Sequence, residues 1–158
     1  MSKRPARKKL GETVVRERPT HEHGAKGLAL LTKKHVAPAK VIEQINRGLP
    51  FSELEHLRTE IDEPFQSLAR QLSISRSTLQ RRKAERRLSP QESDRVMRFW
   101  RIIRRATKVF GNVGRARQWL KFPQRGLGQA VPLEHASSEI GAREVDDLLG
   151  RIDYGVYW

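Results

Sequence analysis

The residues best suited to recognition chemistry lie in a short polar run that begins at Ser75. In the major groove of DNA, arginine pairs with guanine edges and glutamine with adenine, while serine and threonine hydroxyls bind phosphates. Around this run, Leu68, Leu72 and Leu79 have the spacing of a helix-turn-helix, with Ser73 in the turn. The sequence therefore predicts a DNA-reading helix with these candidate contacts: Ser75, Arg76, Ser77, Thr78, Gln80, Arg81 and Lys83.

The apolar spacing alone also fits a helical hairpin that binds no DNA. The predicted outer face carries Ser, Arg, Thr and Gln rather than Glu and Lys, which favours DNA. Arg82, Lys83, Arg86 and Arg87 add charge of the kind that binds the phosphate backbone, although Arg82 stands where such a motif commonly has an apolar residue. A second basic run, at 95–108, contains no acid and predicts either a phosphate-binding face or a solvated one.

Catalytic and metal-binding residues are not expected in this chain. His21 and His23 have no third ligand at helical spacing. The carboxylates near Glu144 lie on a predicted exposed helix face, where solvation is more common than acid–base catalysis. Gly126 and Gly128 follow no strand, so they do not form a phosphate-binding loop. We therefore expect no enzymatic activity, no cofactor, no metal and no small-molecule substrate.

The chain as a whole is strongly basic. Its 158 residues include 32 Lys and Arg against 18 Asp and Glu, a formal charge of +14. This balance favours a polyanionic partner, most simply nucleic acid, and the simpler alternative is a solvated basic surface. The sequence has no cysteine and no apolar run long enough to cross a membrane. These features predict a cytoplasmic protein.

Apolar periodicity and capping residues predict an all-α fold. Ser52 and Ser89 each stand three residues before a glutamate, which is the capping-box pattern at a helix start. After Ser89, Val96, Phe99, Trp100 and Ile103 fall on one face of a long helix. The expected helices cover about 36–47, 52–61, 62–72, 75 onward, 89–110, 116–120, a short segment from 132, and 140–153, with a loop at 124–131.

Charge is distributed unevenly between the two ends of the chain. Residues 1–10 hold five bases and no acid, whereas residues 134–158 hold six acids and two bases. The first 35 residues lack a regular apolar period and predict a basic, flexible arm, which tracks phosphates or does nothing specific. A basic body with an acidic end indicates two different partners.

Several segments in order resemble a known family. Residues 88–96, 109–111, 116–120, 130–134 and 141–156 resemble the toxin-binding domain of Xre/MbcA/ParS antitoxins. The upstream helix-turn-helix resembles the Xre-like domain of the same antitoxins. The resemblance covers about 36–158 and follows the basic arm at 1–35. With a boundary where the cap at Ser89 begins, it implies an Xre-like DNA-binding domain at 36–88 and a C-terminal toxin-binding domain at 89–158.

The resemblance also implies partners. It indicates the antitoxin of a bacterial RES–Xre pair, whose cognate RES-domain toxin consumes or uses NAD. The antitoxin would block the toxin's active site through its C-terminal domain and repress its own operon by binding operator DNA. Antitoxins of this family are similar in being dimeric, so a homodimer is expected.

The C-terminal tip suits insertion into such a site. An NAD pocket holds anionic phosphates and an aromatic base, and the chain ends in two aromatic residues and a free carboxylate. We expect the following toxin-binding residues: Arg143, Asp147, Arg151, Tyr154, Gly155, Val156, Tyr157 and Trp158. In the alternative interpretation, Tyr154, Val156 and Trp158 fold back on the protein's own core.

Two other functions compete with that of an antitoxin. One is an ordinary helix-turn-helix transcriptional regulator whose C-terminal helices serve only dimerisation. The other is a basic RNA- or nucleoid-associated protein without sequence preference. The acidic C-terminus disfavours the second, because a nonspecific polyanion binder gains nothing from it.

Overall fold

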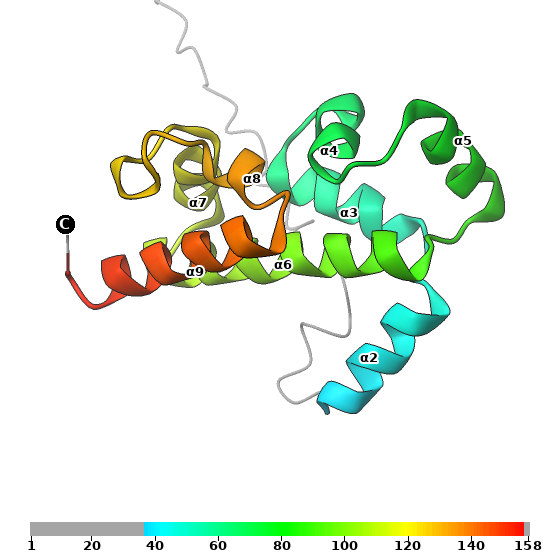
Figure 1. Ribbon diagram of the computed structural model, residues 1–158, viewed down its shortest axis with the longest axis horizontal. Helices are drawn as coiled ribbons and strands as arrows, with labels where there is room; N and C mark the ends of the chain where they lie inside the picture. Colours follow the sequence, from blue (N-terminus) through cyan, green and yellow to red (C-terminus); the bar gives the residue numbers. More distant parts are fainter. Residues whose placement is uncertain (1–36, 157–158) are drawn as a thin grey trace, which may run out of the picture.

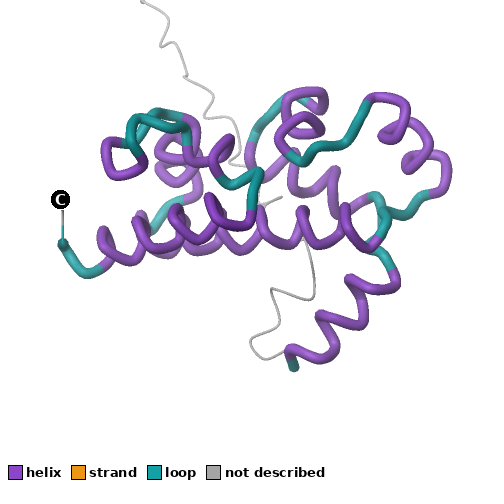
Figure 2. Tube along the Cα trace, in the orientation of Figure 1, coloured by secondary structure: helices purple, strands orange, loops and turns teal. Residues whose placement is uncertain are grey.

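A computed structural model describes residues 37–156 of the chain. The predicted all-α class is confirmed: helices joined by loops make up this part of the chain, with two isolated β-bridges and no strand (Figure 2). None of the helices in this segment is both long enough and apolar enough to span a membrane.

One long helix, α6 (Pro90–Phe110), runs through the molecule, and helices from both halves of the described chain pack against it (Figure 1). A first group lies over its N-terminal half: α3 (Ser52–Ile61), α4 (Phe65–Gln71) and α5 (Arg76–Glu85). A second group lies along its C-terminal half: α7 (Val113–Lys121), α8 (Pro132–His135) and α9 (Glu139–Asp153). Helix α2 (Pro38–Arg47) projects from the other side of α6.

The apolar face of α6 forms the centre of the core, as its periodicity predicts. Val96, Phe99, Trp100 and Ile103 are all buried. Around them pack apolar residues from both groups of helices: Leu54, Leu57, Ile61, Leu68, Leu72, Leu120, Leu133, Val145 and Leu149. A single core therefore joins α3, α4, α7, α8 and α9 to α6, and α5 packs against it only through the half-buried Leu79.

Of the two predicted capping boxes, the one at Ser89 is confirmed. The Ser89 hydroxyl accepts from the Glu92 amide at 3.2 Å, and the Glu92 carboxylate accepts from the Ser89 amide at 2.8 Å. The capping box at Ser52 is wrong, because α3 starts at Ser52 and Phe51 occupies the N-cap position without a side-chain cap. Phe51 is buried and stacks on Phe65, so tertiary packing sets this helix start.

The remaining predicted elements occur with small differences. The 124–131 loop contains a short 3₁₀ turn, Arg125–Leu127, closed by a bridge between Gln124 and Ala130. Asn112 caps α7 by accepting from the amides of the next turn. Gly155, with φ of 71°, follows the end of α9.

The connection between α2 and α3 is held tightly against the segment that joins α5 to α6. The Leu88 amide donates to the Leu49 carbonyl at 2.8 Å, and Arg87 donates to the Gly48 carbonyl at 2.7 Å. Gly48 has φ of 79°, and a Cβ there would lie 2.1 Å from the Leu88 carbonyl oxygen. Only glycine fits this crossing. Arg87, expected to supply charge to DNA, is used here instead.

Gly48→Ala should destabilise the fold more than Gly111→Ala. Both glycines have positive φ, which costs a residue with a Cβ about 1 kcal/mol, but a Cβ at Gly111 meets nothing within 4 Å. Only at Gly48 must backbone move. Thermal unfolding followed by circular dichroism should show a clearly larger loss for Gly48→Ala, and equal losses would contradict the packing of this crossing.

Arg82 links α5 to the start of α6. Its Nε lies 2.7 Å from the Glu92 carboxylate, which is buried and also takes part in the capping box. Its Nη1 lies 2.7 Å from Glu85. Hydrogen bonds to Glu85 and Glu92 raise the pKa of Arg82 against the opposing effect of burial. At position 82, where a helix-turn-helix commonly has an apolar residue, this chain thus has an ion pair. Arg82 holds α5 in place rather than adding charge to its outer face.

Arg82→Met should lower the free energy of unfolding by about 2 kcal/mol, because it leaves the Glu92 carboxylate short of a partner. Arg81→Met is the matched control: its side chain is 60% exposed and 3.8 Å from Glu85, so we expect a change within about 0.5 kcal/mol. Chemical denaturation of both variants measures the difference. Equal stability would show that the Arg82–Glu92 pair does not support the fold.

Candidate nucleic-acid and protein interfaces

The turn between α4 and α5 has the geometry of a helix-turn-helix. Ser73 adopts φ of 53°, the left-handed conformation that glycine more commonly takes in such a turn. The Ile74 amide donates to the Ala69 carbonyl at 2.8 Å, and Leu72 and Ile74 are buried. The chain therefore enters α5 from a closed, anchored turn.

Arg95 of α6 stabilises this turn by hydrogen-bonding its backbone. Its Nη1 donates to the carbonyls of Leu72 at 3.1 Å and Ser73 at 3.2 Å. These bonds satisfy carbonyl groups at the end of α4 and compensate in part for the unfavourable φ of Ser73. The sequence shows Arg95 only as a member of a basic run, and no local signal connects it with a turn 22 positions earlier.

The predicted DNA-contacting residues come together on α5. Ser75 caps the helix by accepting from the Thr78 amide at 3.1 Å, and its hydroxyl also bonds those of Ser77 and Thr78. This network fixes the first turn. Thr78 is half-buried, while Ser75, Arg76, Ser77, Gln80, Arg81 and Lys83 are exposed. Helix α5 lies at one end of the molecule, so this face is open to a partner (Figure 1).

A polar groove of about 610 Å³ separates α5 from the start of α6. Thr78 and Arg81 line it from one side, and Gln91 and Arg95 from the other. Gln91 is exposed in the first turn of α6, where backbone amides favour anions. Gln91 is a candidate phosphate contact that spacing within α5 does not reveal.

The predicted protein-binding residues cluster around the exposed side of α9. The apolar stripe of this helix is buried and includes Val145, Leu148 and Leu149. Arg143 and Asp147 are exposed, and Arg151 is half-buried. Their placement off the stripe agrees with the pattern expected from the sequence, while their contacts with a partner remain predictions.

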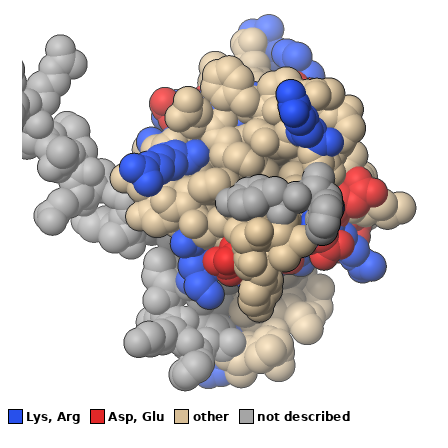
Figure 3. Space-filling model, turned by 90° about the vertical axis from the view of Figure 1, so that its left-hand side faces the viewer, with Lys and Arg blue, Asp and Glu red and all other residues tan. Residues whose placement is uncertain are grey.

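The last described residues extend away from the core. Tyr154 is 82% exposed and Val156 is 42% exposed, so the alternative in which they fold back on the core is wrong for Tyr154 and at most partial for Val156. Tyr157 and Trp158 lie outside the described residues. Figure 3 shows this end of the molecule, where acidic and basic side chains are scattered among residues that carry no charge.

The N-terminal part of α9 is joined to α6 by ion pairs. Glu139 lies 2.8 Å from Arg98 and 3.3 Å from Arg143. Burial acts to raise the pKa of Glu139, but the hydrogen bond from Arg143 and the charges of Arg98, Arg101 and Arg143 outweigh burial and lower it. Arg143 therefore already has one partner within the chain. At the other end of α9, Asp153 lies 3.9 Å from Arg105.

No cluster of three metal-ligating side chains occurs within residues 37–156. His135 hydrogen-bonds Glu144 across the short loop between α8 and α9. His21 and His23 lie outside the described residues.

Two family models match the chain. The antitoxin Xre-like helix-turn-helix domain matches residues 40–101. The antitoxin Xre/MbcA/ParS C-terminal toxin-binding domain matches residues 105–155. The first contains α5 and its turn, and the second contains α9.

Known relatives agree with both matches. An "Antitoxin Xre" of Yersinia enterocolitica is 34% identical over 119 residues, 74% of this chain and 80% of the relative. One of Photorhabdus laumondii is 32% identical over 114 residues, 71% of this chain and 77% of the relative. One of Pseudomonas putida is 32% identical over 68 residues, 43% of each chain. The chain therefore belongs to the Xre antitoxin family, with a helix-turn-helix DNA-binding domain and a C-terminal toxin-binding domain.

Proposed function

We propose that this antitoxin neutralises a RES-domain, NAD-consuming toxin by placing its C-terminal residues in the toxin's active site, and that it represses its own operon through α5. The observation that carries the proposal is the separation of two exposed surfaces along α6: the polar face of α5 at one end and the projecting end of α9 at the other (Figure 1). The protein itself is proposed to have no enzymatic activity and to act in the bacterial cytoplasm.

The exposure of the C-terminal segment supports insertion into a partner. Tyr154 has an aromatic ring with little to cover it, and Gly155 at φ of 71° turns the chain away from α9. After it in the sequence come two further aromatic residues, Tyr157 and Trp158. Aromatic side chains suit a pocket built for the base of NAD, and aromatic anchors in pockets commonly dominate interface energy.

The position of α5 supports operator reading. Its exposed Arg76 and Gln80 are one helical turn apart and face the same side, as direct contacts to neighbouring bases require. One such helix covers only a half-site, so we propose a homodimer that places a second α5 on the next half-site.

Arg76→Ala combined with Gln80→Ala should abolish discrimination between the operator and a scrambled duplex, with a loss of about 1–3 kcal/mol per base contact. Competition gel shifts with both duplexes measure this discrimination. Gln118→Ala, on the exposed side of α7, serves as control and should retain it. Discrimination retained by the double variant would rule out α5 as the recognition helix.

Deletion of 155–158 should abolish neutralisation of the co-expressed toxin while leaving the melting temperature close to that of the full chain, because these residues lie beyond α9. Growth rescue and toxin inhibition in vitro measure the effect. Phe122→Ala removes a different exposed aromatic side chain, 60% accessible on the loop after α7, and should neutralise normally.

The same truncation separates the proposal from the main alternative. If the C-terminal helices serve only dimerisation of an ordinary regulator, the full-length chain does not neutralise a toxin. Truncation then causes no loss of neutralisation, and the truncated chain still binds its operator. Full neutralisation by a folded truncation would contradict insertion of the C-terminal residues.

A further inference from the structure

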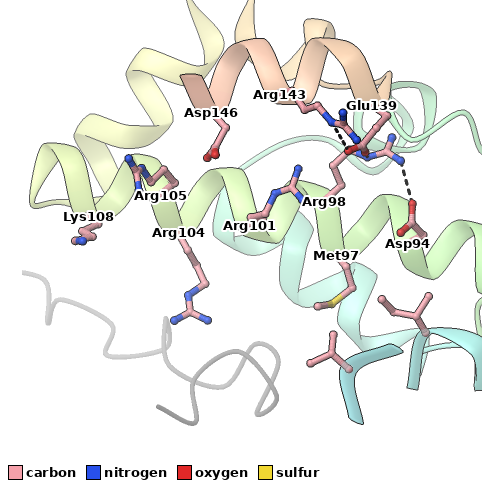
Figure 4. Close-up of a pocket in the computed structure, with 12 residues that line it drawn as sticks. Asp94, Met97, Arg98, Arg101, Arg104, Arg105, Lys108, Glu139, Arg143 and Asp146 are labelled. Carbon is pink, nitrogen blue, oxygen red and sulfur yellow. Dashed lines mark hydrogen bonds and ion pairs between the residues drawn. The ribbon is translucent and has the colours of Figure 1, made fainter. Parts of the chain in front are cut away.

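A groove of about 1100 Å³ runs along α6 between α2 and α9, and we name it the arginine groove (Figure 4). Its lining joins residues of three helices: Val41, Ile45, Asp94, Met97, Arg98, Arg101, Arg104, Arg105, Lys108, Glu139, Arg143 and Asp146. It lies apart from the outer face of α5. Neither the DNA-binding candidates nor the C-terminal tip account for it.

Positive and negative charges occupy different parts of this groove. Two of its three acids lie beside Arg98, Asp94 at 2.9 Å and Glu139 at 2.8 Å, so that part is largely neutralised. Along the C-terminal half of α6 the lining has two acids nearby, Asp146 in the groove and Asp153 at 3.9 Å from Arg105, against four cations: Arg101, Arg104, Arg105 and Lys108. This part of the groove therefore carries excess positive charge.

These four cations flank the groove from two directions. Arg101 and Arg105 extend toward α9, and Arg104 and Lys108 extend toward the opposite side of α6 (Figure 4). From residue 101 to residue 108, α6 rises about 10 Å at about 1.5 Å per residue. One strand of duplex DNA places about three phosphates in that length, at about 3.4 Å of axis each. The spacing thus matches a phosphate backbone laid along α6.

The apolar part of the lining strengthens this positive field. Val41, Ile45 and Met97 form a low-polarity floor beside the arginines. A cleft that combines charges of one sign with apolar walls focuses their field and concentrates counterions. The long aliphatic stems of arginine also pack well on such a floor while their guanidinium groups stay in water.

The lining also indicates which part of a nucleic acid binds. No aromatic side chain lines the groove within the described residues, so it offers no platform on which unpaired bases stack. The available contacts are charge-assisted hydrogen bonds from guanidinium groups and an ammonium group, which suit phosphate oxygens.

We infer that the arginine groove binds the phosphate backbone of a second segment of duplex DNA, distinct from the segment that α5 reads. Helix α5 lies on the side of α3 and α4, whereas α2, one wall of the groove, projects from the other side of α6 (Figure 1). A straight duplex seated on α5 therefore does not fill the groove. The inference adds to the DNA-binding part of the proposed function and rests on it.

The test measures the salt dependence of binding to a short scrambled duplex by fluorescence anisotropy, between about 50 and 200 mM salt. The starting variant carries Arg76→Ala, Arg81→Ala and Lys83→Ala, which removes the charge of α5. Adding Arg101→Gln, Arg104→Gln and Lys108→Gln should reduce the slope of log affinity against log salt by about 2–3, because each phosphate contact contributes about 0.9.

A matched set controls for loss of net charge. Arg115→Gln and Arg125→Gln remove two charges from α7 and the 3₁₀ turn, outside the groove, and match the pair Arg101→Gln and Lys108→Gln. This set should change the slope by less than about 0.5. Should the triple groove variant fail to fold by circular dichroism, Arg101→Gln with Lys108→Gln should still reduce the slope by about 2.

Equal slopes for the groove and control sets would overturn the inference. An unchanged slope combined with weaker binding of the co-expressed toxin would also overturn it and would assign the groove to an acidic segment of that protein. A third outcome separates the two proposals. If the full-length protein does not prefer its operator, but the groove substitutions still reduce the slope of log affinity against log salt, operator reading by α5 is wrong while the groove assignment stands.

Discussion

Burial of one face of α6 is the constraint on which the rest of the molecule depends. Val96, Phe99, Trp100 and Ile103 contribute to the centre of a core that α3, α4, α7, α8 and α9 complete. The helix-turn-helix match ends at residue 101 and the toxin-binding match begins at residue 105, so both meet within this one helix. The DNA-binding and toxin-binding surfaces are consequently joined by a continuous helix rather than by a flexible linker.

Structural roles use much of the basic charge that the sequence suggests for DNA. Arg82 pairs with Glu92, Arg87 bonds the backbone at Gly48, and Arg95 closes the turn before α5. The exposed basic side chains Arg76 and Lys83 on the outer face of α5 have none of these three roles. A count of basic residues cannot make this distinction, because it depends on the acids and carbonyls that folding brings near each guanidinium group.

Local features of the sequence predicted most of the fold. The caps at Ser75 and Ser89 and the apolar stripe of α6 depend on residues within a few positions of each other, and all of them are confirmed. The cap at Ser52 was wrong because Phe51 packs on Phe65 and starts α3 one residue earlier than the box requires. The start of α3 is set by this tertiary contact, which no short sequence pattern contains.

The candidate sites were predictable to a smaller extent. Spacing placed Arg76 and Gln80 on an exposed helix face, and the apolar stripe of α9 indicated which of its residues point outward. The support of the turn by Arg95 and the groove between α2, α6 and α9 come from contacts between segments far apart in the chain.

The shared helix α6 also determines how the protein unfolds. A domain joined to another by a loose linker can open alone, but α6 contributes its side chains to both halves, so loss of either half exposes apolar surface on the other. Unfolding should then spread through the chain as one cooperative event. A protease that engages either end would remove DNA binding and toxin binding together, and no DNA-bound remnant would outlast the toxin-binding half.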